Sequence, residues 1–297
     1  IIDFGIFSDI DSGNLPHNSD RCVIIEEEIY RNLIALKSKK GDLFDLIDRV
    51  GISSIGVIDK DGKKIDSLKR KNWEAPSGNR KFLLDAISIF KYKEGGFIFK
   101  NIKDDDIVIQ NDASSLCLLE YFYGNHDTNK SLLYIGVAEG VNGAYADPGG
   151  LIKMQRHSEM GHIYACRHPY DSNFSIKNSG CNAHLGCFES LCSNGRFRLQ
   201  WNCDLNKIDP NHESFDIASY YFAQMAYIGV LTLNPDRIIF GGPVFEGTSG
   251  LRFIERIRNK FKYFNKDYLP DYQADTAIQR LISRAHFGEG SRFLSAL

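Results

Sequence analysis

Residues 159–189 read EMGHIYACRHPYDSNFSIKNSGCNAHLGCFE, and this stretch decides how the chain is interpreted. It holds Cys181, His184 and Cys187 at the spacing C-x2-H-x2-C, so two thiolates and an imidazole can converge from one short loop. His162, upstream of this loop, supplies a fourth nitrogen or sulfur ligand. Structural zinc takes four such ligands in a tetrahedron. The spacing therefore predicts one structural Zn²⁺ with no open coordination position.

Two carboxylates frame the predicted metal loop. Glu159 lies three residues before His162, and Glu189 lies two residues after Cys187. Ionised carboxylates accept hydrogen bonds, so a rigid loop flanked by them is suited to hold sugar hydroxyls. The alternative interpretation is that the cysteines are ordinary buried thiols and that His184 is a loop residue. Four ligand-type residues at workable spacing, with acidic flanks, favour the metal.

Composition and charge limit the class of partner. The chain has 297 residues, 43% of them apolar and 25% charged, which is typical of a globular protein. A net charge of −2 disfavours nucleic-acid or membrane-surface binding, because both need a basic face. Seven scattered cysteines do not resemble a disulfide framework, and the first residues, IIDFGIFSD, do not resemble a signal peptide. We therefore expect a cytoplasmic protein with a small-molecule ligand.

Strand and helix patterns alternate along the chain, with a break near residue 110. This order predicts two α/β lobes with a cleft between them. Two strand patterns end in polar residues, as expected where an open α/β sheet meets a ligand. Strands are expected over 52–58, 106–110, 132–137 and 237–240, and helices over 26–37, 41–50, 80–91, 113–121, 215–233 and 250–261.

The motifs resemble those of the ROK family of sugar kinases, and within it the bacterial fructokinase branch. The matching segments are IQNDAS (109–114), HSEMGHI (157–163), RHP (167–169), CNAHLGCFES (181–190) and IIFGGPV (238–244). The resemblance implies the actin-like, ribonuclease-H-like sugar kinase fold, an α/β fold of two lobes hinged over a cleft. It places the lobes at 1–110 and 111–282, with the C-terminal helix at about 283–297 joining the first lobe. We also expect a homodimer.

The same resemblance assigns roles to individual residues. Asp112 corresponds to the catalytic base, and hexose contacts are implied for Asn111, Asp112, Glu159, His162 and Glu189. His162 is also a zinc ligand in the family. A carboxylate at a helix start can orient and deprotonate an alcohol, as phosphoryl transfer requires. Without the flanking motifs, Asp112 would be interpreted as an ordinary N-terminal helix carboxylate.

The departures from the family lie on the nucleotide side. The opening segment keeps Asp3 and Gly5 but lacks the second glycine, the threonine and the lysine of the family motif. The predicted second phosphate loop, 138–144, reads AEGVNGA, with Glu139 where the family has threonine. This carboxylate would repel phosphate unless a metal or a protonation change intervenes. The residues that the resemblance implies at the nucleotide are Asp3, Gly5, Gly140, Gly143, Gly241 and Gly242.

Three functional hypotheses follow from this pattern. The first is ATP-dependent phosphorylation of a hexose, foremost fructose, with Mg²⁺ and a structural Zn²⁺. The second is a catalytically impaired, sugar-binding pseudokinase of the same fold, because both phosphate loops are altered. The third is an enzyme of this fold with another phosphoryl donor or acceptor.

Overall fold

The computed structural model describes residues 33–35, 37–54, 57–58, 65–67, 99–152, 157–172, 175, 177, 179–181 and 183–288. The chain divides into two compact units. The first comprises Ile1–Ser115, Met154–His157 and Arg292–Leu297, and the second comprises Leu116–Lys153 and Ser158–Ser291. The lobe boundaries expected from the sequence, 110/111 and 282/283, stay a prediction.

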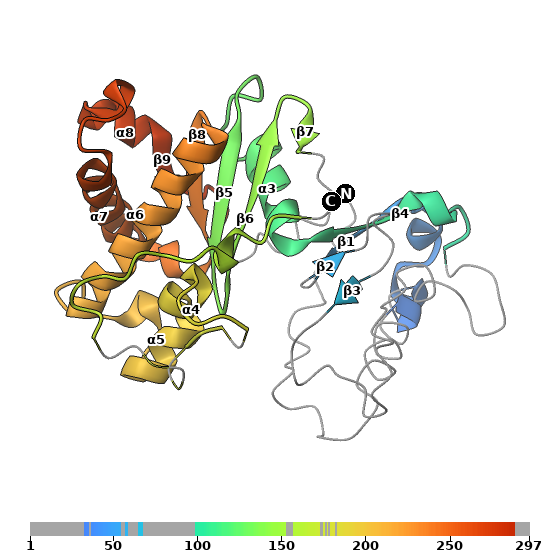
Figure 1. The fold of residues 1–297 in the computed structure, drawn as a ribbon. Coiled ribbons are helices and arrows are strands. Elements are labelled where there is room, and N and C mark those ends of the chain that lie inside the picture. The colour runs from blue at the N-terminus through green and yellow to red at the C-terminus, as the bar shows by residue number, and fades with distance from the viewer. Residues whose placement is uncertain are drawn as a thin grey trace. The chain divides into compact units, whose positions relative to one another are not determined.

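A five-stranded mixed sheet organises the second unit, in the order β7-β6-β5-β8-β9 (Figure 1). β5 pairs antiparallel with β6 and parallel with β8, while β6 is antiparallel to β7 and β8 is parallel to β9. The strands are β5 (Leu132–Val137), β6 (Val141–Asp147), β7 (Gly150–Leu151), β8 (Arg237–Gly241) and β9 (Ile282–Arg284).

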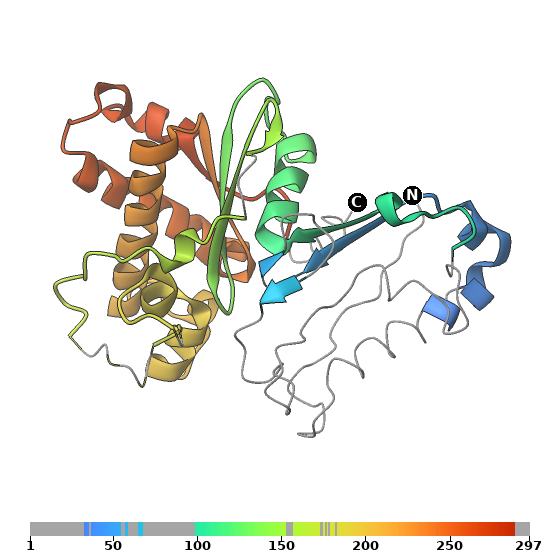
Figure 2. The same ribbon diagram turned by 45° about the vertical axis from the view of Figure 1, so that its right-hand side comes forward.

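β5 is buried along its whole length because helices cover both faces of the sheet. Leu133, Ile135 and Val137 point into the core that α6 and α7 complete. On the opposite face lies α3, as Figures 1 and 2 show, and the Cys117 thiol of α3 donates to the Ala144 carbonyl of β6 at 3.5 Å. The helices are α3 (Asp112–Tyr123), α4 (Phe188–Cys192), α5 (Asn194–Trp201), α6 (Glu213–Leu233), α7 (Gly247–Asn265) and α8 (Asp275–Leu281).

The long helix α6 confirms the expectation for 215–233. It ends at Leu233, where the left-handed φ of 44° at the capping residue Asn234 and the following Pro235 stop the helix, as the sequence predicts. Its apolar face packs on α7, where the Phe215 and Phe253 rings stack. Among the described helices, none offers the length of apolar surface that a bilayer crossing would require.

The first unit is described in part. β1 (Val50–Ser54) runs parallel to β4 (Ile107–Asn111), and β2 (Val57–Ile58) pairs antiparallel with β3 (Ile65–Ser67). The 3-10 helix η1 (Gly41–Leu46) precedes β1, and the rings of Phe44 and Phe99 stack at 4.6 Å. The other described 3-10 turns are η2 (Asp104–Asp106), η3 (Met160–His162), η5 (Leu205–Lys207), η6 (Pro243–Phe245) and η7 (Pro270–Tyr272).

Several expected boundaries were wrong. The helix expected over 41–50 is a 3-10 turn that ends at Leu46, because the chain is extended from Val50 as the partner of β4. The single strand expected over 52–58 divides into β1 and β2, which belong to different sheets. β9 takes residues 283 and 284 from the predicted C-terminal helix. The helix expected over 80–91 lies outside the described residues, as do most of 26–37 and the remainder of the C-terminal helix.

A fully buried ion pair ties the long loop after η3 to α5. Arg196 donates to the Asp171 carboxylate, and neither side chain is exposed to solvent. Tyr221 of α6 donates to the same carboxylate at 2.7 Å, and Gln200 accepts from Arg196 at 2.7 Å. The Tyr221 hydroxyl also accepts from the backbone amide of His168 at 3.1 Å. The network therefore fixes the chain around 168–171 against two helices.

We predict that Asp171→Asn destabilises the protein strongly. Removing one partner of a buried ion pair leaves the other charge uncompensated, which typically costs about 3–5 kcal/mol. Asp275→Asn is the matched control, because Asp275 pairs with Lys262 at 2.6 Å on the surface, where such pairs contribute up to about 1 kcal/mol. Urea denaturation of both variants measures the difference. Equal unfolding free energies for the two variants would contradict the structural role of the buried pair.

Candidate functional site

Two histidines and two cysteines of the second unit converge on one point. The ligand atoms of His162, Cys181, His184 and Cys187 all lie within 4.8 Å of one another. His162 Nδ1 is 3.3 Å from His184 Nδ1, 3.7 Å from Cys181 Sγ and 3.8 Å from Cys187 Sγ. A tetrahedron with Zn–N of about 2.0–2.1 Å and Zn–S of about 2.3 Å has N–N edges of about 3.3 Å and N–S edges of about 3.6 Å. The four predicted ligands are therefore spaced to hold a zinc ion.

The local chain conformation explains this convergence. Ile163 accepts from the Phe188 amide at 3.0 Å and Ala165 donates to the Gly186 carbonyl at 3.0 Å, so the two ends of the loop lie side by side. Gly186, at φ 103°, turns the chain into Cys187, which caps α4 by accepting from the Ser190 amide at 3.4 Å.

Backbone amides also support the thiol of Cys181. The amides of Ala183 and His184 donate to Cys181 Sγ at 3.4 and 3.3 Å. Hydrogen bonds of this kind around a metal-ligand atom fix its position and stabilise its charge.

The two cysteines differ in acidity. Burial raises the pKa of the Cys181 thiol to about 11. Burial also opposes ionisation of Cys187, but hydrogen bonds from His162 and Ser190 outweigh it, so the pKa of Cys187 falls below its ordinary value. The hydrogen bond with Cys187 in turn raises the pKa of His162. A cation binding here would have to displace the Cys181 proton, so uptake would release protons.

The two predicted hexose carboxylates are attached to opposite ends of this Cys/His cluster. Glu159 immediately precedes η3, and its Oε2 lies 3.7 Å from His162 Nε2, the ring nitrogen that faces away from the cluster. Glu189 lies in the first turn of α4 and accepts from the Val141 amide at 3.1 Å. The cluster therefore sets the backbone positions from which both carboxylates extend.

Asn111 and Asp112 lie where β4 passes into α3, at the carboxyl end of a parallel strand. The Ala113 amide donates to both side chains, at 3.0 Å to Asn111 and 2.9 Å to Asp112. Both residues belong to the first unit, whereas Glu159, His162 and Glu189 belong to the second. That all five contact one hexose stays a prediction.

The predicted phosphate loop 138–144 is shorter than expected, because β6 already begins at Val141. Gly140 packs against the Glu189 carboxylate, and Gly143 is a strand residue covered by Met160. A Cβ at either position would collide with these side chains. Close packing therefore favours glycine at both positions without any nucleotide contact, and their nucleotide role stays a prediction.

Arg198, a residue that the sequence patterns did not single out, pairs with Glu139 at the tip of the hairpin. The same guanidinium donates to Asp204, and this charge network holds the pKa of Asp204 at about 2. The Gly195 amide of α5 donates to the Glu139 carbonyl at 3.4 Å. The charge of Glu139 is therefore balanced by an arginine, rather than by the metal or protonation change that the sequence suggested.

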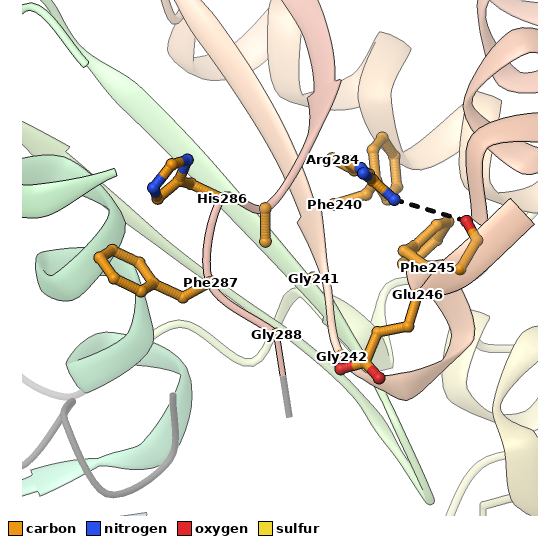
Figure 3. Close-up of a pocket in the computed structure, with 11 residues that line it drawn as sticks. Phe240, Gly241, Gly242, Phe245, Glu246, Arg284, His286, Phe287 and Gly288 are labelled. Atoms are coloured by element: carbon orange, nitrogen blue, oxygen red, sulfur yellow. Dashed lines mark hydrogen bonds between the residues drawn. The ribbon is translucent and has the colours of Figure 1, made fainter. Parts of the chain in front are cut away.

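Gly241 and Gly242 line a pocket of about 250 Å³ at the carboxyl end of β8. Figure 3 shows them between His286 and Phe287 on one side and Arg284 and Glu246 on the other. Packing requires these glycines too, because a Cβ at Gly241 would collide with the Tyr134 hydroxyl and one at Gly242 with the Val137 carbonyl. Asp3 and Gly5 lie outside the described residues.

Comparison with known proteins places this geometry in a family. Residues 99–289 match the ROK family. The fructokinase of Streptococcus mutans is 32% identical over 141 residues, which are 48% of this chain and 47% of that protein. The fructokinase of Zymomonas mobilis is 30% identical over 160 residues, 53% of this chain and 52% of that protein. The chain thus spans about half the length of the curated relatives it matches.

Solved structures share the fold at low sequence identity. The ROK hexokinase of Thermus thermophilus superimposes with a TM-score of 0.63 at 18% identity, covering 95% of this chain and 86% of that one. A ROK glucokinase of Streptomyces griseus, solved with glucose and AMPPNP, gives 0.60 at 15% identity, covering 89% and 85%. The expected actin-like ATPase fold is confirmed.

We predict that Gly161→Ala disrupts the cluster. A Cβ at Gly161, inside η3, would overlap the Val141 carbonyl of β6, so η3 must move and carry His162 with it. Overpacking of this kind typically costs about 1–3 kcal/mol. Gly149→Ala is the control, because the nearest atom is the Asp147 side-chain oxygen of a surface turn, 3.1 Å away. Competition with a chelator measures Zn²⁺ affinity, which should fall only in Gly161→Ala.

Proposed function

The chain belongs to the ROK family, and on this premise we propose that it is a carbohydrate kinase that phosphorylates a hexose with ATP. Fructose is the first candidate substrate, because the similar curated proteins are named fructokinases. The observation that carries the proposal is the Cys/His cluster with Glu159 and Glu189 attached at its two ends. A rigid pair of carboxylates is suited to accept hydrogen bonds from neighbouring sugar hydroxyls.

Asp112 is the proposed base. It would accept the proton of the attacking hydroxyl while Asn111, Glu159, His162 and Glu189 hold the sugar in place. Phosphoryl transfer depends mainly on positioning and on neutralising charge, and Mg²⁺ bound with ATP would supply part of that neutralisation. The Ala113 amide, 2.9 Å from Asp112 Oδ1, supports the proposal by orienting the carboxylate at the end of β4.

The proposed zinc is structural. His162, Cys181, His184 and Cys187 would fill all four positions, so the ion would have no place for substrate or water. Its contribution would be to fix the backbone on both sides of the loop, from which Glu159 and Glu189 extend.

The pocket at Gly241 and Gly242 is the proposed site of the nucleotide base and ribose. It lies at the carboxyl end of β8, where open α/β sheets bind ligands. The hairpin at Glu139 would lie on the phosphate side. The pairing of Arg198 with Glu139 supports this placement, since the guanidinium, which Glu139 shares with Asp204, reduces the negative charge that would repel phosphate.

A sugar-binding pseudokinase is the second candidate. The observation that favours it is the loss of the threonine and lysine from the segment that follows Asp3, together with Glu139 in place of threonine. Each lost donor to developing charge typically lowers a rate by about 10²–10³. The pseudokinase would bind hexose at the same carboxylates and would bind ATP poorly.

We further propose a cytoplasmic homodimer without a nucleic-acid partner. The described cysteines are all free thiols, as in a reducing compartment. A ROK transcriptional regulator also shares the fold, with a TM-score of 0.64 at 14% identity, so the fold alone does not separate kinases from regulators. The net charge of −2 favours the kinase.

The kinase proposal predicts a split between turnover and binding. Asp112→Asn should lower kcat by about 10²–10⁴, because general-base catalysis acts on the proton in the transition state. Fructose affinity should change little. Calorimetry with ATP-Mg²⁺, fructose, glucose and mannose measures the ligand affinities. A coupled assay measures kcat. A wild-type protein that binds hexose but shows no ATP binding or turnover would refute the kinase and favour the pseudokinase.

The zinc proposal predicts about one Zn²⁺ per chain in protein purified without added metal. Cys187→Ser should lose the ion and unfold at lower temperature, because structural zinc contributes directly to folding. Cys203→Ser is the control, since Cys203 is a half-buried thiol outside the cluster. Elemental analysis measures the zinc content of each variant, and thermal denaturation measures its unfolding temperature. A metal-free wild type that keeps its fold and its hexose affinity would overturn the proposal.

A further inference from the structure

Helix α3 carries a buried carboxylate that no part of the proposed chemistry uses. Glu120 is 2% exposed, and its two oxygens accept from the backbone amides of His286 and Phe287 at 3.0 and 2.9 Å. These contacts span 166 and 167 residues of sequence. Burial raises the pKa of Glu120, against the opposing effect of the two amide hydrogen bonds and the charge of Arg237. The carboxylate is thus held in place by two amides that belong to one short segment.

That segment, residues 285–288, is one wall of the pocket in Figure 3. It follows β9, which is fixed by its pairing with β8 and by Arg258, whose Nη2 donates to the Ile282 carbonyl at 2.7 Å. The Ala285 amide still donates to the Phe240 carbonyl at 2.8 Å. Beyond Ala285, in the described part of the chain, the backbone amides of His286 and Phe287 both donate to the Glu120 carboxylate.

The wall therefore departs from the sheet after Ala285, the last residue of this segment whose amide is bonded to β8. From there its backbone is held by a side chain of α3, on the opposite face of the sheet from α6 and α7 (Figure 1). Gly124 packs directly against Glu120, and a Cβ there would collide with its carboxylate, so the space around the anchor is closed. Because the buried carboxylate accepts from both amides, it fixes the backbone of His286 and Phe287 at hydrogen-bond distance from α3.

We propose that Glu120 is a positioning residue for the nucleotide: it holds the 285–288 wall at the distance from Gly241 and Gly242 that the base and ribose require. The proposal rests on the proposed kinase function. Glu120 does not touch the ligand and acts only through the two backbone amides. Its loss should therefore weaken nucleotide binding and leave hexose binding, at the Cys/His cluster and Asn111–Asp112, unaffected.

Glu120→Gln is the principal test. The amide group replaces one acceptor oxygen by a donor, which faces a backbone N–H and repels it. We expect the Kd for ATP-Mg²⁺ to rise at least about tenfold, with the Kd for fructose within about twofold of wild type. Amide hydrogen exchange at His286 and Phe287 should accelerate. Glu120→Asp keeps the charge but is one methylene shorter, so we expect the same selective loss of nucleotide affinity. It serves as the test if Glu120→Gln does not fold.

Asp236→Asn is the control for the same loss of an acceptor oxygen, at an exposed position. Asp236 also accepts from a backbone amide, that of Ser131 at 2.8 Å, and from the Ser131 hydroxyl at 2.9 Å. It immediately precedes β8, at the end of that strand remote from Gly241. The same chemical change there should leave both ligand affinities unchanged. A general loss of stability would move both affinities, whereas a positioning role moves only that of the nucleotide.

The outcomes separate this proposal from the kinase proposal. A wild-type protein that binds fructose but not ATP-Mg²⁺ would overturn both. A wild type that binds both, with unchanged ATP affinity in a folded Glu120 variant, would overturn only the positioning role. Equal weakening of fructose and ATP binding would also overturn it, because it would reduce Glu120 to a general stabilising residue.

Discussion

The convergence of two imidazoles and two thiols is the constraint on which the second unit's functional surface depends. Their ligand atoms lie within 4.8 Å of one another, although His162 and Cys187 are far apart in the chain. The loop between them can vary in path, but its two ends cannot separate while the cluster is intact. Glu159 and Glu189 are attached at those ends, and Glu189 in turn binds the Val141 amide of the hairpin. The cluster therefore fixes the backbone that carries the two proposed sugar-binding carboxylates. Through Glu189 it is also linked to the hairpin at the proposed phosphate site.

The cluster was predictable from sequence because its information is local. C-x2-H-x2-C places three ligands within seven residues, and a fourth ligand needs only a chain reversal. The strand 132–137 and the helix stop at Asn234 and Pro235 were predictable for the same reason, since an uninterrupted apolar run and a helix-breaking pair act on their own neighbours. Apart from His162, which lies 19 residues before Cys181, the deciding residues in each case lie within a few positions of the pattern.

The predictions that were wrong concern features that depend on contacts between residues far apart in the sequence. β6 was interpreted as part of a glycine-rich loop, yet its Gly143 packs against Met160, and Gly140 just before the strand packs against Glu189. Both side chains come from elsewhere in the chain. The division of the expected strand 52–58 follows from the pairing of β1 with β4, more than 50 residues away, as the register of Val50 with Ile107 shows. Local propensity does not contain this information, because tertiary partners decide which residues are extended and which glycines are obligatory.

This difference bears on how altered motifs are judged. Glu139 reads as a defect when only its own loop is considered, because a carboxylate replaces a hydroxyl beside the expected phosphate. Its partner Arg198 lies 59 residues away, and no spacing rule connects the two. A sequence motif cannot reveal a compensating charge at that separation, although it shows the replacement of threonine by Glu139 directly. Degenerate phosphate loops therefore overstate the case for a pseudokinase wherever a distant side chain balances the change. At Glu139 the structure supplies that side chain for the charge, so the pseudokinase is favoured only by the lost donors: the threonine hydroxyl at position 139 and the residues missing after Asp3.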